Sequence, residues 1–143
     1  QIWFLPVSPT LDPKTSKPIN LTPNDPGGNY ETPGIVFNTP NFFVTWTKKS
    51  PHRVYGAIVS PDGAVVAPPQ ELSPPGSHNR FAGALALGDR VVLIYARKQD
   101  ATGFDLFSRT FSKTLSPLSA PQALTSGVGD ETPARSAGGE VTR

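Results

Sequence analysis

The chain contains neither cysteine nor methionine among its 143 residues. The absence of cysteine excludes disulfide bonds and metal sites that use thiolate ligands. It also favours an exported bacterial protein over a disulfide-rich eukaryotic one. Because translation starts with methionine, we expect residue 1 not to be the translational start, and the chain to be processed or to belong to a longer polypeptide.

Long apolar runs and strong charge are missing as well. No stretch approaches the ~18 consecutive apolar residues of a transmembrane helix, and residues 1–8 lack the basic start and the long apolar run of a signal peptide. The formal net charge of +2 is too small to indicate nucleic acid as a partner. A sustained helical period is also absent, so we expect almost no helix.

Proline and glycine are abundant, with 17 and 13 residues, and they fall between short strand-like runs. We interpret them as turns. Together they make about a fifth of the chain, which is below the level typical of disordered sequences. The length corresponds to one ordinary domain, and the pattern predicts an all-β fold.

Residues 54–63 form the stretch around which the chain is organised, an alternating strand that ends in a Ser-Pro-Asp-Gly turn. Versions of this stretch occur about 52 residues earlier and later. The serine at position 60 has counterparts at Ser8 and Ser112. An aromatic residue occupies the same register in each copy, at Trp3, Tyr55 and Phe107.

Two further patterns recur in the same order. The pattern Pro-x-x-Leu-Ser/Thr occurs at residues 18–22, 69–73 and 121–125, and the strand-like run 43–46 matches the run 92–95. A period of about 50 residues with several short strands per copy is typical of β-propellers. A β-sandwich with coincidentally regular strand spacing is the alternative.

The first strand of each predicted cycle is rich in small residues, which suits the crowded inner strand of a propeller blade. The run 91–96 is apolar on both faces, as expected for a sheet packed between two other sheets. We therefore predict β-propeller-like repeats of about 51 residues, with four antiparallel strands per blade. The boundaries are residues 1–30 for the outer strands of a first blade, 31–73 for a second, 80–125 for a third and 131–143 for the start of a fourth.

The repeat resembles those of bacterial secreted or surface β-propeller proteins, and residues 54–63, 69–73 and 88–95 carry the resemblance best. It implies the fold and an extracytoplasmic location, whether secreted, periplasmic or at the cell surface. It implies no single activity, because propellers serve as lectins, hydrolases and scaffolds. The turn at residues 60–63 is also similar to the Asp-box of sialidases, but here Gly63 follows Asp62 directly and no Thr-Trp comes after. We interpret it as a turn.

The chain accommodates about 2.8 of these units, whereas closed propellers have about 4–8 blades. An open arc would expose apolar sheet faces. We therefore expect this chain either to be part of a longer polypeptide or to assemble with one or two further copies into a ring.

One group of predicted loops carries most of the basic side chains. We expect these loops to share one face of the propeller, together with the fewer acidic residues Asp25, Asp100 and Asp130. Such a positive face attracts an anionic partner, such as an acidic protein surface, an anionic glycan or a lipid headgroup. Ordinary solvated loop charge is the alternative. The candidate binding residues are Lys48, Lys49, His52, Arg53, His78, Arg80, Arg97 and Lys98.

Catalytic patterns are not recognisable. Glu31, Arg80 and Glu131 occupy equivalent positions in successive cycles, which favours structural ion pairing between neighbouring blades. His52 and His78 have no carboxylate at ligand spacing and make a weak case for a metal. We predict no catalytic, cofactor or metal site.

The hypothesis that follows is a non-catalytic exported scaffold or protein-interaction module, whose partner is another protein or the remaining blades of the propeller. A glycan-binding propeller is an alternative, with Tyr30 and Phe104 as the aromatic residues at loop edges. The other alternative is the propeller domain of a hydrolase whose active site lies outside this segment.

Overall fold

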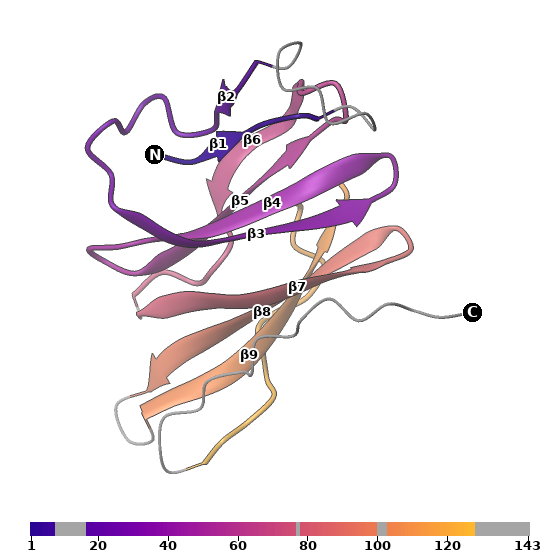
Figure 1. Ribbon diagram of the computed structural model, residues 1–143. Helices are drawn as coiled ribbons and strands as arrows, with labels where there is room; N and C mark the ends of the chain where they lie inside the picture. The colour runs from indigo at the N-terminus through magenta and orange to yellow at the C-terminus, as the bar shows by residue number, and fades with distance from the viewer. Residues whose placement is uncertain (8–16, 77, 100–102, 128–143) are drawn as a thin grey trace.

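The computed structural model describes residues 1–7, 17–76, 78–99 and 103–127. These residues form ten strands in three antiparallel sheets, with no helix among them (Figure 1). The prediction of an all-β chain is thus confirmed. Within the described ranges no helix is long and apolar enough to cross a membrane.

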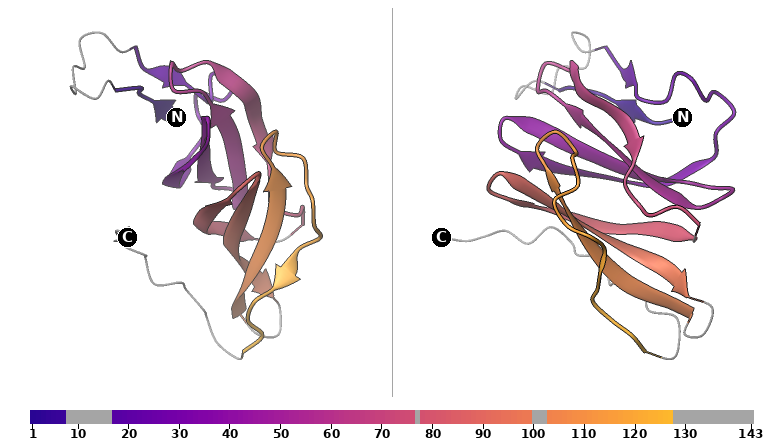
Figure 2. Two further views of the ribbon diagram at one scale, coloured as in Figure 1. Left: turned by 90° about the vertical axis from the view of Figure 1, so that its right-hand side faces the viewer. Right: turned by 180° about the vertical axis from the view of Figure 1, so that it is seen from behind.

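The three sheets follow one another along the chain (Figure 2). The N-terminal sheet pairs β1 (Trp3–Phe4) with β2 (Ile19–Asn20). The middle sheet has the order β3-β4-β5-β6, and the C-terminal sheet has the order β7-β8-β9-β10. Their bounds are Tyr30–Asn38, Asn41–Lys48, Arg53–Val59 and Val65–Glu71 for β3 to β6, and Asn79–Leu87, Arg90–Gln99, Gly103–Ser112 and Gln122–Ala123 for β7 to β10.

Both four-stranded sheets are simple meanders, formed by residues 30–71 and 79–123. The prediction that Arg97 and Lys98 lie in a loop is wrong, because β8 continues to Gln99 and keeps its register with β9. Arg80, also predicted in a loop, lies in β7, which begins at Asn79. The residues at these strand ends are polar, so the apolar alternation in the sequence stops there. The backbone pairing nevertheless continues through them. The sheets form no closed ring among the described residues, and the predicted start of a fourth blade at residues 131–143 lies outside them.

The Ser-Pro-Asp-Gly stretch is a tight turn, as predicted. The amide of Gly63 donates to the carbonyl of Ser60 at 2.9 Å, and the amide of Ala64 donates to Ser60 Oγ at 2.9 Å. Gly63 has a φ of +92°, which glycine adopts at little steric cost. The turn after β9 is built in the same way: Leu115 donates to the carbonyl of Ser112 at 3.0 Å and has a φ of 64°.

The Pro-x-x-Leu-Ser/Thr motif fastens each outer strand to its neighbour. The hydroxyl of Ser73 accepts a hydrogen bond from the amide of Val54 at 3.1 Å, while the amide of Leu72 donates to the Val54 carbonyl at 2.8 Å. The same two bonds occur in the other sheets. Thr22 accepts from Ile2 at 3.0 Å and Thr125 accepts from Leu106 at 2.8 Å, with matching bonds from Leu21 and Leu124 at 2.9 and 2.7 Å.

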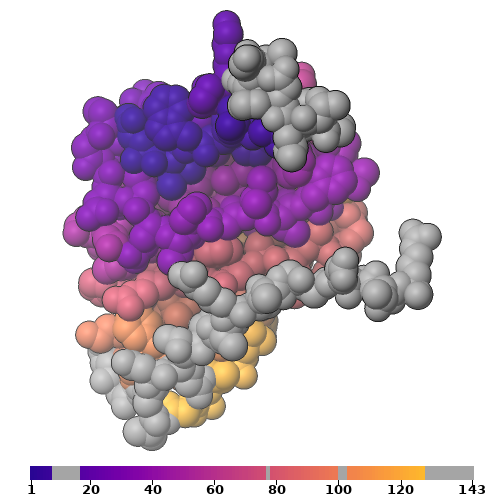
Figure 3. Space-filling model, viewed as in Figure 1, coloured from indigo at the N-terminus to yellow at the C-terminus, as the bar shows by residue number. Residues whose placement is uncertain are grey.

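The middle sheet packs against a neighbouring sheet on each of its two faces. Trp46, Val44 and Ala57 pack toward the N-terminal sheet, in one cluster with Ile2 and Phe4. Figure 3 shows the N-terminal strand, in indigo, lying over the middle sheet. Phe43 and Val54 pack toward the C-terminal sheet, where they meet Leu93 and Tyr95. The expectation of a sheet packed between two other sheets rests on residues 91–96 of the C-terminal sheet, where Val92 and Ile94 are only partly buried. Among the described residues it is the middle sheet that has a sheet on each side.

An aromatic pair joins the second and third strands of each large sheet. Trp46 stacks on Tyr55 with ring centroids 6.4 Å apart, and Tyr95 stacks on Phe107 at 6.0 Å. In each pair the two residues are direct cross-strand partners, and such aromatic pairs stabilise a sheet. The recurring aromatic at Tyr55 and Phe107 is thus one half of a cross-strand stack.

Candidate functional site

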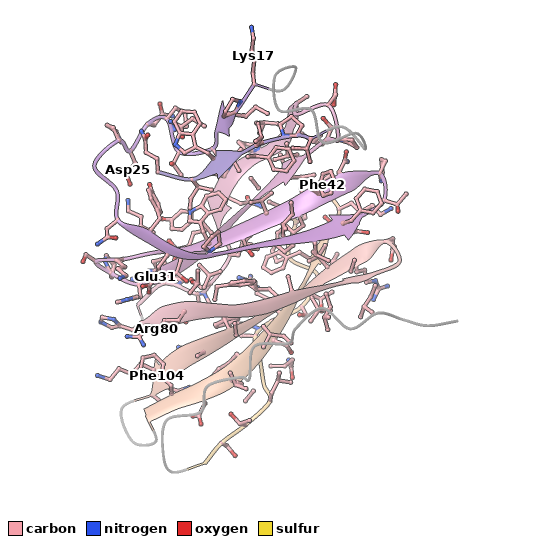
Figure 4. The ribbon with its side chains drawn as sticks, in the orientation of Figure 1. Lys17, Asp25, Glu31, Phe42, Arg80 and Phe104 are labelled. Atoms are coloured by element: carbon pink, nitrogen blue, oxygen red, sulfur yellow. The ribbon has the colours of Figure 1, made fainter. Side chains whose placement is uncertain are left out.

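The basic residues singled out in the sequence lie at one edge of the two large sheets, which we call the charged edge. In an antiparallel meander the beginning of the first strand, the end of the second and the beginning of the third meet at the same edge. Figure 4 shows Asp25, Glu31, Arg80 and Phe104 along this side of the molecule. Lys48, Arg53, Arg80, Arg97 and Lys98 lie in strand ends rather than loops, whereas Lys49, His52 and His78 lie between strands.

An ion pair occupies the part of the charged edge nearest the N-terminal sheet. Lys48 Nζ lies 2.6 Å from Asp25 Oδ2, and the Tyr30 hydroxyl donates to the same oxygen at 2.7 Å. These hydrogen bonds lower the pKa of Asp25, and the partner carboxylate raises the pKa of Lys48. Burial, followed by the bond to Asp25, raises the pKa of Tyr30. Around pH 7 the pair therefore holds one positive and one negative charge.

A second group of charges surrounds Glu31. Its carboxylate lies 2.7 Å from Lys49 Nζ and 3.4 Å from His52 Nε2. The hydrogen bond from Lys49 is the main reason why the pKa of Glu31 is lowered. Partial burial and the positive charge of Arg80 lower the pKa of His52, so this ring is neutral around pH 7. On its other side, His52 Nδ1 lies 3.4 Å from His78 Nδ1.

The arginines of the charged edge contact acids and aromatic rings. Arg53 Nε lies 3.1 Å from Glu71 Oε1. The guanidinium carbons of Arg80 and Arg97 lie 4.9 and 5.5 Å from the ring centroids of Phe104 and Phe107, a geometry that gives a cation–π attraction.

The expected ion pairing between neighbouring sheets is replaced by a different arrangement. The close partners of Glu31 come from its own sheet, Lys49 and His52, while Arg80 acts on Glu31 only as a more distant charge. Glu131, the third member of the predicted series, lies outside the described residues. Because Asp25, Glu31 and Glu71 each neutralise a predicted basic residue, the charged edge is less positive than its composition indicates.

The two histidines come together with a carboxylate, which their sequence spacing did not indicate. Nevertheless, the described part of the chain contains no group of three or more His, Asp or Glu side chains that could hold a metal ion. The contact from Glu31 to His52 and on to His78 is therefore a polar chain across the boundary between the two large sheets.

A cavity of about 460 Å³ opens beside the Asp25–Lys48 pair. Its walls come from the segment that leaves β2, from the ends of β3 and β4, and from β5 and β6. The lining residues are Asn20, Leu21, Thr22, Pro23, Asn24, Asp25, Tyr30, Trp46, Lys48, Tyr55, Val65, Pro68 and Pro69. The volume lies within the range of about 300–1,000 Å³ that is usual for small-ligand sites.

Sequence reasoning identified Lys48 and Tyr30 as candidates, whereas it placed Trp46 and Tyr55 in predicted strands and gave them no binding role. Trp46 is almost fully buried, yet it also lines the cavity. Asp25 lies far from Lys48 in the sequence, so no local spacing rule connects the two. The signal that could have joined them is the hairpin register, which pairs Tyr30 with Lys48.

Comparison of the chain with protein-family models, with curated proteins and with solved structures finds no match.

Proposed function

We propose that the three sheets are consecutive blades of a β-propeller, and that the protein is a non-catalytic, exported scaffold or protein-interaction module. The two large sheets support the fold, since both are four-stranded meanders in which equivalent residues make the same contacts about 50 residues apart. The resemblance to secreted bacterial propellers supports the extracytoplasmic location.

The observation that carries the proposal is the exposure of one face of the C-terminal sheet. Leu124 is 53% exposed, whereas its counterpart in the middle sheet, Leu72, is fully buried against the C-terminal sheet. We call this face the outer face and define it by Leu85, Leu87, Val92, Ile94, Leu106 and Leu124, which cross-strand register places on one side of the sheet. An apolar face of this kind marks an interaction site.

The opposite end of the stack is also uncovered. The side chains of Ile35 and Phe37 on β3 are exposed, as is Trp3 on β1. Trp3 corresponds to Tyr55 and Phe107, each of which stacks on an aromatic residue of the preceding strand. A strand beside β1 would supply the same partner to Trp3. Both ends therefore suit further sheets of the same kind, either from a longer polypeptide or from other copies of the chain.

The charged edge supports a protein partner. Its carboxylates pair with lysine, histidine and arginine of the same chain, so the attraction for a strongly anionic ligand is reduced. Arginine and aromatic residues are enriched in protein interfaces, and the charged edge presents both, with Arg80 over the ring of Phe104.

The test is to compare the mass of the native polypeptide with the mass of its assembly in solution, by mass spectrometry and by light scattering coupled to gel filtration. A polypeptide well above 15.2 kDa, or an assembly of several copies that Leu124→Glu dissociates, supports the proposal. Val66→Glu is the matched control, because Val66 is equally exposed but lies on β6. A native 15.2 kDa monomer that is unaffected by Leu124→Glu would contradict it.

A further inference from the structure

The cavity beside Asp25 lies between two sheets, and its described lining comes from both of them. The segment 20–25 forms one wall, and β4, β5 and β6 of the middle sheet form the other. Both of these walls belong to this chain, so the properties of the cavity can be considered independently of the proposed propeller.

The charged groups of the cavity cancel each other. Asp25 and Lys48 are the charged residues of its lining, and they are in contact at 2.6 Å. A ligand with a net charge would face an opposite charge that is already paired, together with a like charge nearby. The cavity thus favours an uncharged ligand.

A buried donor in the cavity wall has no acceptor. Trp46 lines the cavity, and its indole N–H is buried without a hydrogen-bond partner in the protein. A buried donor of this kind is unfavourable unless something accepts from it. The hydroxyl of Tyr95, at the equivalent place in the C-terminal sheet, is also buried without a partner, but Tyr95 belongs to the apolar core between the sheets. Trp46, unlike Tyr95, is a lining residue of the cavity described here.

The remaining lining offers polar groups of both kinds beside aromatic rings. Asn20 Oδ1 accepts from the Thr22 amide at 2.8 Å, which leaves the NH2 group of Asn20 as a donor. Tyr30 donates its proton to Asp25, so its oxygen can accept. Tyr55 and the prolines at 68 and 69 add apolar walls. A ligand that both donates and accepts, and that also has an apolar face, fits this lining best.

We propose that the cavity binds an uncharged, polyhydroxylated ligand, a terminal sugar residue of a glycan. A sugar hydroxyl accepts from the Trp46 indole, and the other hydroxyls bond to the Asp25–Lys48 pair and to Asn20 and Asn24. The apolar face of the ring lies against Tyr30 and the prolines. The site would add glycan recognition to a scaffold, and it does not depend on the scaffold role.

The two tryptophans of the chain allow a direct test by NMR. The indole N–H resonance of Trp46 is identified in ¹⁵N-labelled chain by its persistence in the Trp3→Phe variant. The probes are methyl glycosides of glucose, galactose, mannose and N-acetylglucosamine, titrated to about 10 mM, which saturates a site with a millimolar Kd. With at least one probe, the Trp46 resonance is expected to shift and saturate, while that of Trp3 stays unchanged.

Variants decide whether the shift comes from the cavity. Asp25→Asn and Lys48→Met each remove one half of the ion pair and are expected to weaken binding by about tenfold. Asp89→Asn is the matched control, an exposed acid in the turn between β7 and β8, and it leaves the affinity unchanged. The dispersion of the amide spectrum shows whether each variant is folded, and either cavity variant suffices.

Several outcomes would overturn the proposal. They are the absence of any saturable Trp46 shift with all four glycosides, a shift that both cavity variants leave intact, and saturable binding of glucuronate in place of the neutral sugars. A monomeric 15.2 kDa protein that still shows the Trp46 shift would remove the scaffold proposal and leave the glycan site standing.

Discussion

The middle and C-terminal sheets have the same strand order and the same fastening bonds, but they differ in what covers them. Asn38 is 7% exposed and donates to the backbone of Arg90 in the next sheet, whereas Leu87, which holds the same hairpin position, is 58% exposed. The buried residue of this pair is polar and the exposed one is apolar. Burial at this hairpin position is therefore determined by the neighbouring sheet and not by the type of residue. Four predictions follow from this difference, in order of decreasing effect.

The largest difference is expected at the leucine of the recurring motif. Leu72→Ala removes a fully buried side chain from the core between the two large sheets and should lower the free energy of unfolding by about 2–5 kcal/mol. Leu124→Ala, on the exposed counterpart, should change it by less than about 0.5 kcal/mol. Urea denaturation of both variants measures the contrast. If both variants lost the same free energy, Leu124 would have to be buried within the isolated chain, and the outer face would not be exposed.

The hydroxyl groups of the Pro-x-x-Leu-Ser/Thr motif should show the same contrast in their contribution to the free energy of unfolding. Ser73→Ala leaves the buried amide of Val54 without its side-chain acceptor and should cost about 1–3 kcal/mol. Thr125→Ala removes the equivalent bond to Leu106 at a less buried place, where water can replace the hydroxyl, and should cost about 0.5–1 kcal/mol. The two variants are compared by denaturation and by amide exchange at Val54 and Leu106. A larger cost at Thr125 would contradict the comparison.

Two glycines at positive φ sharpen the comparison further: Gly63 in the middle sheet lies against the N-terminal sheet, whereas Gly88 in the C-terminal sheet has open space around it. Gly63→Ala places a Cβ at positive φ and against Ile19 of the N-terminal sheet, so it should cost about 1–2 kcal/mol. Gly88→Ala is the control, since Gly88 also has positive φ but has open space around its Cβ position. Only Gly63→Ala should also loosen β2, which amide exchange of β2 would detect. Equal effects at both positions would exclude the contact with Ile19 as the cause.

Much of this fold could be predicted because its determinants are local and repeat. The turn at Gly63 and the motif that contains Leu72 and Ser73 each depend on a few neighbouring residues. The extension of β8 to Gln99 could not be predicted, since polar residues at a sheet edge carry no apolar alternation. The site depends on register and on contacts between sheets. The pairing of Asp25 with Lys48 and the access to Trp46 arise only once β2, β3 and β4 lie side by side.

The smallest predicted effect concerns the charged edge, where Glu31 of the middle sheet and Arg80 of the C-terminal sheet hold corresponding places. Folding lowers the pKa of Glu31 below its ordinary value of 4.5, mainly through the bond from Lys49. Near that pH the unfolded chain binds more protons than the folded one. The contribution of Glu31 is therefore fully present above pH 4.5 and is lost as the pH falls through the lowered pKa.

Glu31→Gln should remove this part of the acid-side dependence, and at neutral pH it should lower the free energy of unfolding by less than about 1 kcal/mol, as for an exposed ion pair. Folding also lowers the pKa of His52 below its ordinary value of 6.5. The free energy of unfolding therefore falls through His52 at higher pH than through Glu31, as the pH drops below 6.5. Denaturation curves measured in each of the two pH windows therefore distinguish Glu31 from His52. Asp89→Asn, which changes an exposed acid outside the charged edge, should leave the profile as it is. If Glu31→Gln and Asp89→Asn gave the same profile, the pairing of Glu31 with Lys49 would contribute nothing to the fold.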